Sequence, residues 1–262
     1  MKIFFEKYHG TGNDFILVDD RENRIELSAS RIAEICHRRF GIGADGLILL
    51  RNAAGFDFEM NYFNSDGLPG SMCGNGGRCI TAFAKSLGII TNRAMFIASD
   101  GVHTAEILST DPIIVKLKMA DVKSVESNPD FFFLNTGSPH VVRFIQDVEH
   151  TDVVSIGRQI RNQERYKPGG ANVNFVEIRG TELYVRTYER GVEDETLSCG
   201  TGVTAAALAS VKKGLAFPVN GIRHLHTPGG LLKVHYTELN GGFVDVFLEG
   251  PALKVFSGQL EL

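Results

Sequence analysis

Apolar residues recur along this chain at two spacings, and these spacings predict both strands and helices. Phe56, Phe58, Met60 and Tyr62 alternate with polar residues, which indicates a half-buried strand that ends at Asn64. Shorter apolar runs predict further strands on both sides of the middle of the chain. They cover residues 2–19, 47–50, 94–98, 103–108 and 113–119 in the first half, and residues 137–140, 172–178, 183–188, 231–236 and 243–248 in the second.

Four segments carry apolar residues at helical spacing. The first covers residues 28–40 and is followed by Gly41 as a stop signal. Two others begin directly after Cys73 and Cys199. The fourth places Val153, Ile156 and Ile160 on one face. Helices therefore separate the strands in each half of the chain.

A polar stretch divides the predicted elements into two groups. Residues 121–130 contain Asn128-Pro129 and few apolar side chains, which is typical of a linker. We therefore predict domains at residues 1–120 and 121–250. The tail, residues 251–262, is a candidate to pack back on the first domain.

The two halves also share a motif. Cys73-Gly74-Asn75-Gly76 and Cys199-Gly200-Thr201-Gly202 both follow the pattern Cys-Gly-x-Gly, and each precedes a predicted helix. An upstream glycine, Gly10 or Gly137, precedes the cysteine by 63 positions in the first half and by 62 in the second. Matching order and spacing predict an internal duplication.

Composition and charge exclude several classes of protein. A net charge of −4 and a pI near 6.1 argue against a nucleic-acid-binding protein, which normally has a basic stripe. Charge interrupts the first residues too early for a signal peptide, and no apolar run approaches the roughly 18 residues of a membrane span. Four cysteines without paired CxxC spacing indicate reduced thiols. We expect a cytoplasmic, two-domain enzyme that acts on a small molecule, with no nucleic-acid or membrane partner.

A cysteine at the start of a helix is suited to acid/base chemistry. The exposed N–H groups and the helix dipole stabilise a thiolate, and they lower its pKa from about 8.5 into the range of roughly 3.5–7.5. Two such helix ends that act on one substrate can also hold a carboxylate and the charge it gains. Removal of the proton α to a carboxylate needs both functions. One thiolate accepts the proton while the other thiol donates one to the opposite face.

Three other uses of these cysteines remain open at this point. Cys73, Cys79 and Cys199 could hold zinc, although they lack the usual close ligand pairs. One thiol activated by His140 could act as a nucleophile, but this leaves the duplication unexplained. A two-cysteine redox pair is the third alternative. We interpret Cys36 and Cys79 as packing residues.

The same motifs, taken together, resemble the diaminopimelate epimerase family over essentially the whole chain. The similarity is carried by five blocks: His9-Gly10-x-Gly12-Asn13-Asp14-Phe15, Phe63-Asn64-Ser65-Asp66-Gly67, Cys73-Gly74-Asn75-Gly76-Gly77-Arg78-Cys79, Glu189-Arg190-Gly191 and Cys199-Gly200-Thr201-Gly202. The resemblance implies an α+β fold of two pseudo-symmetric domains. Each is a curled, mostly antiparallel, barrel-like sheet around a central helix, with the active site in the cleft between the domains. It also implies a homodimer.

The resemblance further implies interconversion of LL- and meso-diaminopimelate, on the route to lysine and the peptidoglycan cross-link, without pyridoxal phosphate, another cofactor or a metal. Cys73 and Cys199 match the acid/base pair of the family, and His140 and Glu189 match residues that assist the thiols. The substrate-binding positions of the family match Asn13, Asn64, Asn172, Glu189 and Arg190 by side chain, and Gly74, Asn75, Gly200 and Thr201 by backbone N–H.

The chain departs from the family pattern at three places. Ser138 stands where many members have asparagine, and Gly46 stands where some have glutamine. Residues 191–196 are one residue longer and more acidic than the commonest form. None of these changes removes a catalytic group. The nearest rivals are the proline and hydroxyproline racemases, which use the same pair of thiols in the same fold; phenazine-type isomerases lack the cysteine pair.

Overall fold

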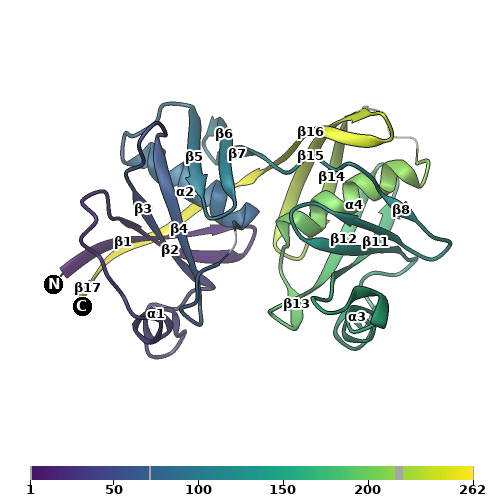
Figure 1. The fold of residues 1–262 in the computed structure, drawn as a ribbon, viewed down its shortest axis with the longest axis horizontal. Coiled ribbons are helices and arrows are strands. Elements are labelled where there is room, and N and C mark those ends of the chain that lie inside the picture. Colours follow the sequence, from purple (N-terminus) through teal and green to yellow (C-terminus); the bar gives the residue numbers. More distant parts are fainter. Residues whose placement is uncertain (1, 71, 216–220, 262) are drawn as a thin grey trace. The chain divides into compact units, whose positions relative to one another are not determined.

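The computed structural model describes residues 2–70, 72–215 and 221–261. The chain forms two compact units (Figure 1). Unit 1 contains Met1–Leu117 together with Gly250–Leu262, and unit 2 contains Lys118–Glu249. The C-terminal tail thus belongs to unit 1, where it pairs with the first strand of the chain.

Seven strands of unit 1 occur in the order that the apolar pattern predicts, and the tail adds an eighth. They are β1 (Lys2–Gly10), β2 (Asn13–Asp19), β3 (Gly46–Arg51), β4 (Phe58–Asn64), β5 (Arg93–Ala98), β6 (Gly101–Thr110), β7 (Ile113–Lys118) and the tail strand β17 (Leu253–Glu261). Helix α1 (Ala29–Cys36) connects β2 to β3, and α2 (Gly74–Ser86) connects β4 to β5.

Unit 2 repeats this order. Its strands are β8 (Glu126–Ser127), β9 (Phe132–Asn135), β10 (Pro139–Phe144), β11 (Asn172–Arg179), β12 (Glu182–Glu189), β13 (Asp194–Thr196), β14 (Ile222–Thr227), β15 (Gly230–Leu239) and β16 (Gly242–Pro251). Helix α3 (Val153–Arg161) and the short 3-10 helix η1 (Glu164–Tyr166) connect β10 to β11, and α4 (Gly200–Lys212) lies between β13 and β14.

Strand pairing shows that the two units are copies of one design. From β1 to β7 the consecutive pairs are antiparallel, parallel, antiparallel, parallel, antiparallel and antiparallel. The series β9, β10, β11, β12, β14, β15 and β16 pairs in the same sequence of directions. Each parallel step needs a crossover, and the helices supply it. The predicted α+β fold of two pseudo-symmetric, mostly antiparallel units is confirmed.

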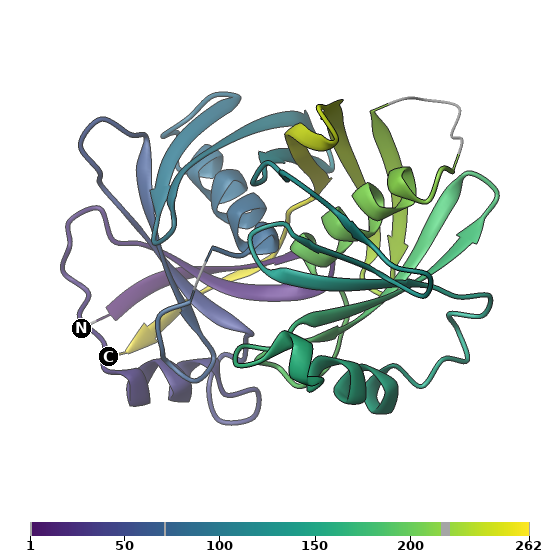
Figure 2. The ribbon, with the colours of Figure 1, turned by 45° about the vertical axis from the view of Figure 1, so that its right-hand side comes forward.

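The central helix of each unit is almost completely enclosed by strands. Residues 74–84 of α2 are buried, and α2 packs on β1 to β4 and on β6. Residues 200–210 of α4 are buried except Thr201, and α4 packs on β9 to β12 and on β14 and β15. Figures 1 and 2 show each helix against the curled strands of its own unit. Small residues, chiefly alanine and glycine, let the strands approach α4 closely.

The outer helices are shorter and amphipathic. Helix α1 buries Ile32, Ile35 and Cys36 against the sheet of unit 1, while α3 buries Val153 and Ile160 against β11 and β12. The helix predicted over residues 28–40 is therefore too long. It ends at Cys36 because His37 takes an extended conformation, with φ −68° and ψ 123°.

Candidate active site

Cys73 and Cys199 occupy equivalent positions at the N-termini of the two central helices. Cys73 is the N-cap of α2, with φ −107° and ψ 126°, and Cys199 is the N-cap of α4, with φ −111° and ψ 111°. Neither side chain forms a capping hydrogen bond. The first N–H groups of a helix have no intrahelical acceptor, so both thiols lie at a helix end that favours negative charge.

In unit 1 the Cys73 thiol contacts the side chain of Asn13. Its Sγ lies 3.5 Å from Asn13 Oδ1, which also accepts a hydrogen bond of 3.2 Å from Asn75 Nδ2. Asn13 Nδ2 in turn donates to Asp45 Oδ2 at 2.7 Å. Strands β2 and β3 are parallel and begin at the same edge, which brings Asn13 and Asp45 together.

Arg78 lies behind this group and is fully buried. Its guanidinium donates to Asn75 Oδ1 at 3.0 Å, to Gly74 O at 3.2 Å and to Thr11 Oγ1 at 3.3 Å. Burial lowers the pKa of Arg78, but a guanidinium stays protonated in proteins. Arg78 therefore places a buried positive charge within electrostatic reach of Cys73.

In unit 2 a buried histidine lies beside two asparagines of β11. His140 of β10 is opposite Asn172 in the parallel register, and its Nδ1 lies 3.1 Å from Asn174 Nδ2. Asn174 Nδ2 also donates to Val141 O at 3.0 Å, and Asn174 Oδ1 accepts from Thr187 Oγ1 at 3.0 Å. A carbonyl oxygen only accepts, so the orientation of the Asn174 amide is fixed.

This orientation determines the tautomer of His140. Nδ1 must accept from Asn174, so the proton is on Nε2. Nε2 lies 3.5 Å from Asn172 Nδ2, which is itself a donor engaged with Pro139 O and Ser138 Oγ. The Nε2–H group thus remains available to another acceptor. Burial, and to a smaller extent the charge of Arg190, lower the pKa of His140 to about 3, so the ring is neutral.

Cys199 lies close to this histidine network. A Cβ added at Gly202 would lie 2.3 Å from Asn174 Oδ1 and 3.3 Å from Cys199 Cβ, so the glycine lets α4 approach β11. The Cys199 Sγ is 3.5 Å from Thr201 Oγ1. Thr136 Oγ1 donates to Thr201 O at 2.9 Å and fixes the first turn of α4.

Arg190 is held at the end of β12 by two residues that the sequence singled out. Its backbone N–H donates to Asn172 Oδ1 at 2.8 Å, and its Nη2 donates to Ser138 Oγ at 3.3 Å. The Ser138 hydroxyl also accepts from Asn172 Nδ2 at 3.0 Å. Ser138, where many members of the family have asparagine, therefore supports the guanidinium.

The longer acidic segment, residues 191–196, folds against arginines and forms strand β13. Glu195 accepts two hydrogen bonds of 2.6 Å from Arg186, and Glu193 forms an ion pair of 2.7 Å with Arg161. At its end, Thr196 Oγ1 donates to Glu189 Oε2 at 2.8 Å. The segment therefore positions the Glu189 carboxylate.

Asn64 and Gly46 lie opposite each other at the end of β4 and the start of β3. Asn64 begins the turn in which its carbonyl accepts from Gly67 N–H at 2.9 Å. A Cβ at Gly46 would lie 2.4 Å from the ring of Tyr62 and 2.5 Å from Phe63 O. This chain therefore has no space for a glutamine at position 46.

The two remaining cysteines are buried in apolar surroundings. Burial raises the pKa of Cys36 to about 11 and that of Cys79 to about 12, so both are thiols at neutral pH. The interpretation as packing residues agrees with this burial. Within the described ranges, no group of three or more His, Cys, Asp or Glu side chains is arranged to hold a metal.

The structure thus brings several of the predicted residues together in each unit, whereas Asn64 and Glu189 bond to residues outside these groups, Gly67 and Thr196. Unit 1 brings Cys73, Asn13 and Asn75 together, and unit 2 brings His140, Asn172 and Arg190 together. The sequence interpretation missed Asp45 and Asn174 and gave no role to Arg78. Asn174 had a signal, because it lies two positions after Asn172 and so on the same face of a strand.

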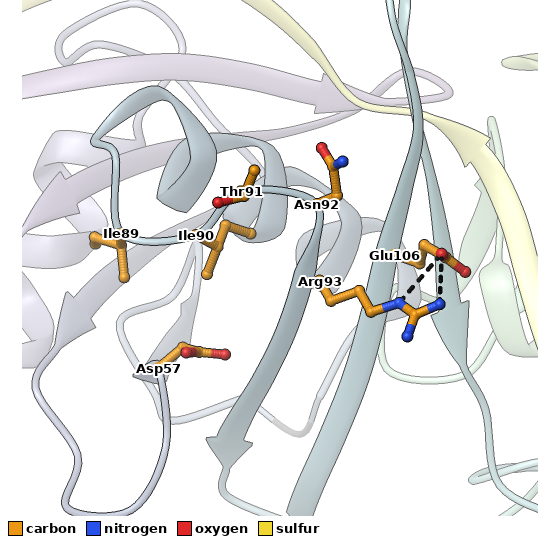
Figure 3. A pocket seen from close by; sticks show the side chains of 7 residues that line it. All are labelled: Asp57, Ile89, Ile90, Thr91, Asn92, Arg93 and Glu106. Atoms are coloured by element: carbon orange, nitrogen blue, oxygen red, sulfur yellow. Dashed lines mark hydrogen bonds and ion pairs between the residues drawn. The ribbon is translucent and has the colours of Figure 1, made fainter.

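A surface pocket of about 610 Å³ lies elsewhere in unit 1. It is lined by Asp57, Arg93, Glu106 and residues 89–92, and Figure 3 shows the ion pair between Arg93 and Glu106 at its side. None of the predicted site residues lines it. The clusters around the two cysteines, and not this pocket, are the candidate active site.

No helix in the described part of the chain is long and apolar enough to cross a membrane.

A sequence model described as diaminopimelate epimerase matches residues 5–125 and 132–255. A diaminopimelate epimerase from Flavobacterium psychrophilum is 49% identical over 261 residues, which cover 98% of both chains.

Two solved structures share the fold at low sequence identity. A phenazine biosynthesis protein of the PhzF family from Bacillus anthracis has a TM-score of 0.78, at 13% identity, and the match covers 100% of both chains. A hydroxyproline epimerase from Agrobacterium vitis has a TM-score of 0.73, at 14% identity, over 99% of this chain and 92% of that one. At such identities the likeness concerns the fold alone.

Proposed function

This chain belongs to the diaminopimelate epimerase family, and we propose that it interconverts LL- and meso-diaminopimelate with Cys73 and Cys199 as the proton-transferring groups. The protein is an isomerase that acts on a small molecule. No cofactor is needed in this proposal, since the thiols and the helix ends supply the acid/base and electrostatic functions. The reaction belongs to the synthesis of lysine and of the peptidoglycan cross-link.

One observation carries the proposal. Two thiols cap the central helices of two duplicated units in nearly the same backbone conformation, and neither is used to cap its helix. Epimerisation needs one group to remove the α-proton and another to return a proton on the opposite face. A duplicated fold with one thiol per unit supplies such a pair.

The helix ends also stabilise the charge that forms during the reaction. Loss of the α-proton moves negative charge onto the carboxylate of the substrate. We assign the backbone N–H groups of Gly74, Asn75, Gly200 and Thr201 to this carboxylate, because they belong to the first turns of α2 and α4. The same helix ends favour the thiolate form of each cysteine.

His140 and Glu189 are assigned to assist proton transfer. His140 is neutral and keeps its Nε2–H for an acceptor, which suits a hydrogen bond to a thiolate or to a substrate oxygen. It is not suited to act as a proton acceptor through Nδ1, because Asn174 occupies that atom. Glu189, held by Thr196, is a candidate partner for a substrate amino group.

Arg190 is the best candidate for the carboxylate at the far end of diaminopimelate. A guanidinium binds a carboxylate through two parallel hydrogen bonds. Ser138 and Asn172 hold Arg190 in place, so we assign Asn172 a positioning role as well as its predicted place near the substrate. Asn13 and Asn64 stay candidates for further substrate contacts.

A proline-type racemase is the second candidate, because a hydroxyproline epimerase has the same fold. Arg190 favours a substrate with a second carboxylate, which proline lacks. We also propose that the protein works in the cytoplasm as a homodimer. Large apolar side chains are exposed on neighbouring strands of unit 1, with Phe4 69% and Val255 57% exposed, and a second copy of the chain would cover them.

The test is incubation of the purified protein with LL-diaminopimelate and, separately, with L-proline in deuterated water. We expect the α-hydrogen of diaminopimelate to exchange and its configuration to invert. Cys73→Ala and Cys199→Ala should each lower the rate of inversion by about 10²- to 10⁴-fold or more. Cys36→Ala, which removes a buried thiol outside both clusters, is the matched control and should keep the activity.

Two outcomes would count against the proposal. If either active-site variant keeps more than about a tenth of the activity, one thiol suffices and the two-base mechanism is wrong. If L-proline is racemised as fast as diaminopimelate is epimerised, the substrate assignment is wrong although the two-thiol chemistry stands.

A further inference from the structure

A chain of two side-chain amides connects a buried cation to a carboxylate in unit 1. Arg78 Nη2 donates to Asn75 Oδ1 at 3.0 Å, Asn75 Nδ2 donates to Asn13 Oδ1 at 3.2 Å, and Asn13 Nδ2 donates to Asp45 Oδ2 at 2.7 Å. We call Asn75 and Asn13, between these two charged ends, the amide chain. It runs directly past Cys73, whose Sγ lies 3.5 Å from Asn13 Oδ1.

The charged ends fix the direction of every hydrogen bond in the amide chain. A guanidinium only donates, so Asn75 must turn its oxygen to Arg78 and its NH₂ group to Asn13. An ionised carboxylate only accepts, so Asn13 must turn its NH₂ group to Asp45. Both requirements agree, and together they leave the oxygen of Asn13 facing the sulfur of Cys73.

Both ends are themselves held in place. Arg78 is fully buried, and among the described residues no carboxylate lies within ion-pairing distance of it. Asp45 accepts from the backbone N–H of Asp14 at 3.2 Å and from Arg38 at 2.6 Å. The charged or titratable groups around Cys73 and the amide chain are Lys7, Asp14, Arg38, Asp45, Arg78 and Cys79.

We propose that Asp45 is a positioning residue for Cys73, and that it acts through Asn13 to keep this thiol protonated in the free protein. An oxygen acceptor bonds to S–H and not to a thiolate, so it favours the neutral form. The inference rests on the proposed function only in giving Cys73 a catalytic role. Cys73 then meets the substrate as the proton donor.

Other groups favour the opposite form of this cysteine. The N-terminus of α2 and the buried charge of Arg78 both stabilise a thiolate at Cys73. The orientation of one amide therefore decides between the two forms. If Asn13 turned over, its NH₂ group would face the sulfur and would support a thiolate. Two groups oppose this turn: Asn75, whose NH₂ group donates to the oxygen of Asn13, and Asp45, which accepts from its NH₂ group. Asp45 is the charged one of the two.

Unit 2 surrounds its thiol with different groups. Its Sγ lies 3.5 Å from the hydroxyl of Thr201, which can donate or accept. The position that corresponds to Arg78, five residues after the cysteine, is Thr204, whose hydroxyl bonds to Gly200 O at 2.9 Å. The duplicated units thus differ at the position five residues after each cysteine, with a buried guanidinium in unit 1 and a hydroxyl group in unit 2.

The test is the pH dependence of alkylation of the free protein by iodoacetamide, with Cys73 and Cys199 followed separately in peptides by mass spectrometry. In Asp45→Asn the amide of Asn13 loses its anionic acceptor and is held only by Asn75, so it turns over more easily, and the midpoint for Cys73 should fall by about one pH unit. Below both midpoints Cys73 should then react about tenfold faster than in the unmutated protein. The midpoint for Cys199 should not move.

Three further variants separate positioning from other effects. Asp45→Glu keeps the acceptor for Asn13 Nδ2 and should retain the unmutated profile. Asp45→Ser repeats the loss of charge with a different side chain. Asp57→Asn is the matched control, because Asp57 also accepts a backbone N–H, from Met95 at 2.7 Å, but has no contact with the amide chain.

A double-variant cycle with Asn13→Ala decides whether Asp45 acts through Asn13. In the Asn13→Ala background, Asp45→Asn should lose most of its effect on the Cys73 midpoint. An equal shift in both backgrounds would mean a direct charge effect and would overturn the proposal, as would an unchanged midpoint in Asp45→Asn. Alkylation needs no turnover, so a shifted midpoint in a protein without epimerase activity would refute the proposed function and leave this inference standing.

Discussion

At the scale of single residues, His140 gives the clearest dependence of stability on pH. Its pKa is lowered from 6.5 to about 3 by burial and by the charge of Arg190. Below pH 6.5 the unfolded chain therefore binds a proton that the folded chain does not bind until about pH 3. Because the unfolded state binds more protons between about pH 3 and pH 6.5, the free energy of unfolding rises with pH across this range. The contribution of His140 to stability is fully present above this range.

We expect the free energy of unfolding to fall by about 2 kcal/mol between pH 6.5 and pH 5 through His140 alone. Denaturant titrations at several pH values measure this. His140→Gln should remove that part of the pH dependence, whereas His150→Gln, which changes an exposed histidine, should not. Equal slopes for the unmutated protein and for His140→Gln would contradict the lowered pKa.

Residue-scale interpretation of the sequence relied on motifs, and it missed residues whose importance comes from contacts within the fold. Cys73, Cys199 and Arg190 stand in recognisable blocks, but their catalytic and binding roles stay predictions. Asp45 stands in no block that the sequence interpretation used. Its importance comes from the parallel pairing of β2 and β3, which joins residues 31 or more positions apart, so no local pattern could indicate it.

At the scale of elements, the close contact of α4 with β11 depends on Gly202. A methyl group there would lie 2.3 Å from Asn174 Oδ1, so either the helix or the asparagine must move. We expect Gly202→Ala to lower the free energy of unfolding by about 1–3 kcal/mol, the usual cost of overpacking. Denaturant unfolding of the variant measures this cost.

The control for this prediction is the same substitution in a background without the clashing side chain. Asn174→Ala alone removes hydrogen bonds to Val141, Thr187 and His140 and is destabilising by itself. In that background, Gly202→Ala should cost clearly less than in the unmutated protein. Equal costs in both backgrounds would mean that another neighbour of Gly202 limits the packing.

Most elements were predicted from periodicity, but strands β8, β9, β13, β14 and β17 were not, and helix α1 was predicted too long. Strand β8 (Glu126–Ser127) lies within the polar stretch expected to be a linker and has only two residues, too few for any alternation. Strand β13 (Asp194–Thr196) is acidic, and arginines of neighbouring segments stabilise it. Helix α1 ends early because backbone conformation at His37, not apolar spacing, stops it.

At the scale of the whole chain, the internal duplication was the most informative prediction. It came from two copies of Cys-Gly-x-Gly at matched spacing, and the matching series of strand directions confirms it. The pairing of the tail strand β17 with β1 carried no local signal. Pairing between segments at opposite ends of a sequence depends on the complete fold. The sequence therefore indicated only that the tail was a candidate to pack on the first domain.

The exposed face of β1 and β17 leads to the last prediction, on the assembly of the protein. Phe4 of β1 and Val255 of β17 are 69% and 57% exposed, and the two strands pair along their length. Exposed apolar side chains on a strand pair favour association, and a two-fold axis lets identical surfaces cover each other.

We therefore expect a homodimer in sedimentation experiments. The double variant Phe4→Lys, Val255→Lys should shift it to monomers, because like charges would then face each other. Phe40→Lys, which changes an aromatic residue that is 88% exposed elsewhere in unit 1, should leave the dimer intact. A monomer in the unmutated protein, or equal dissociation in both variants, would show that this face is not the interface.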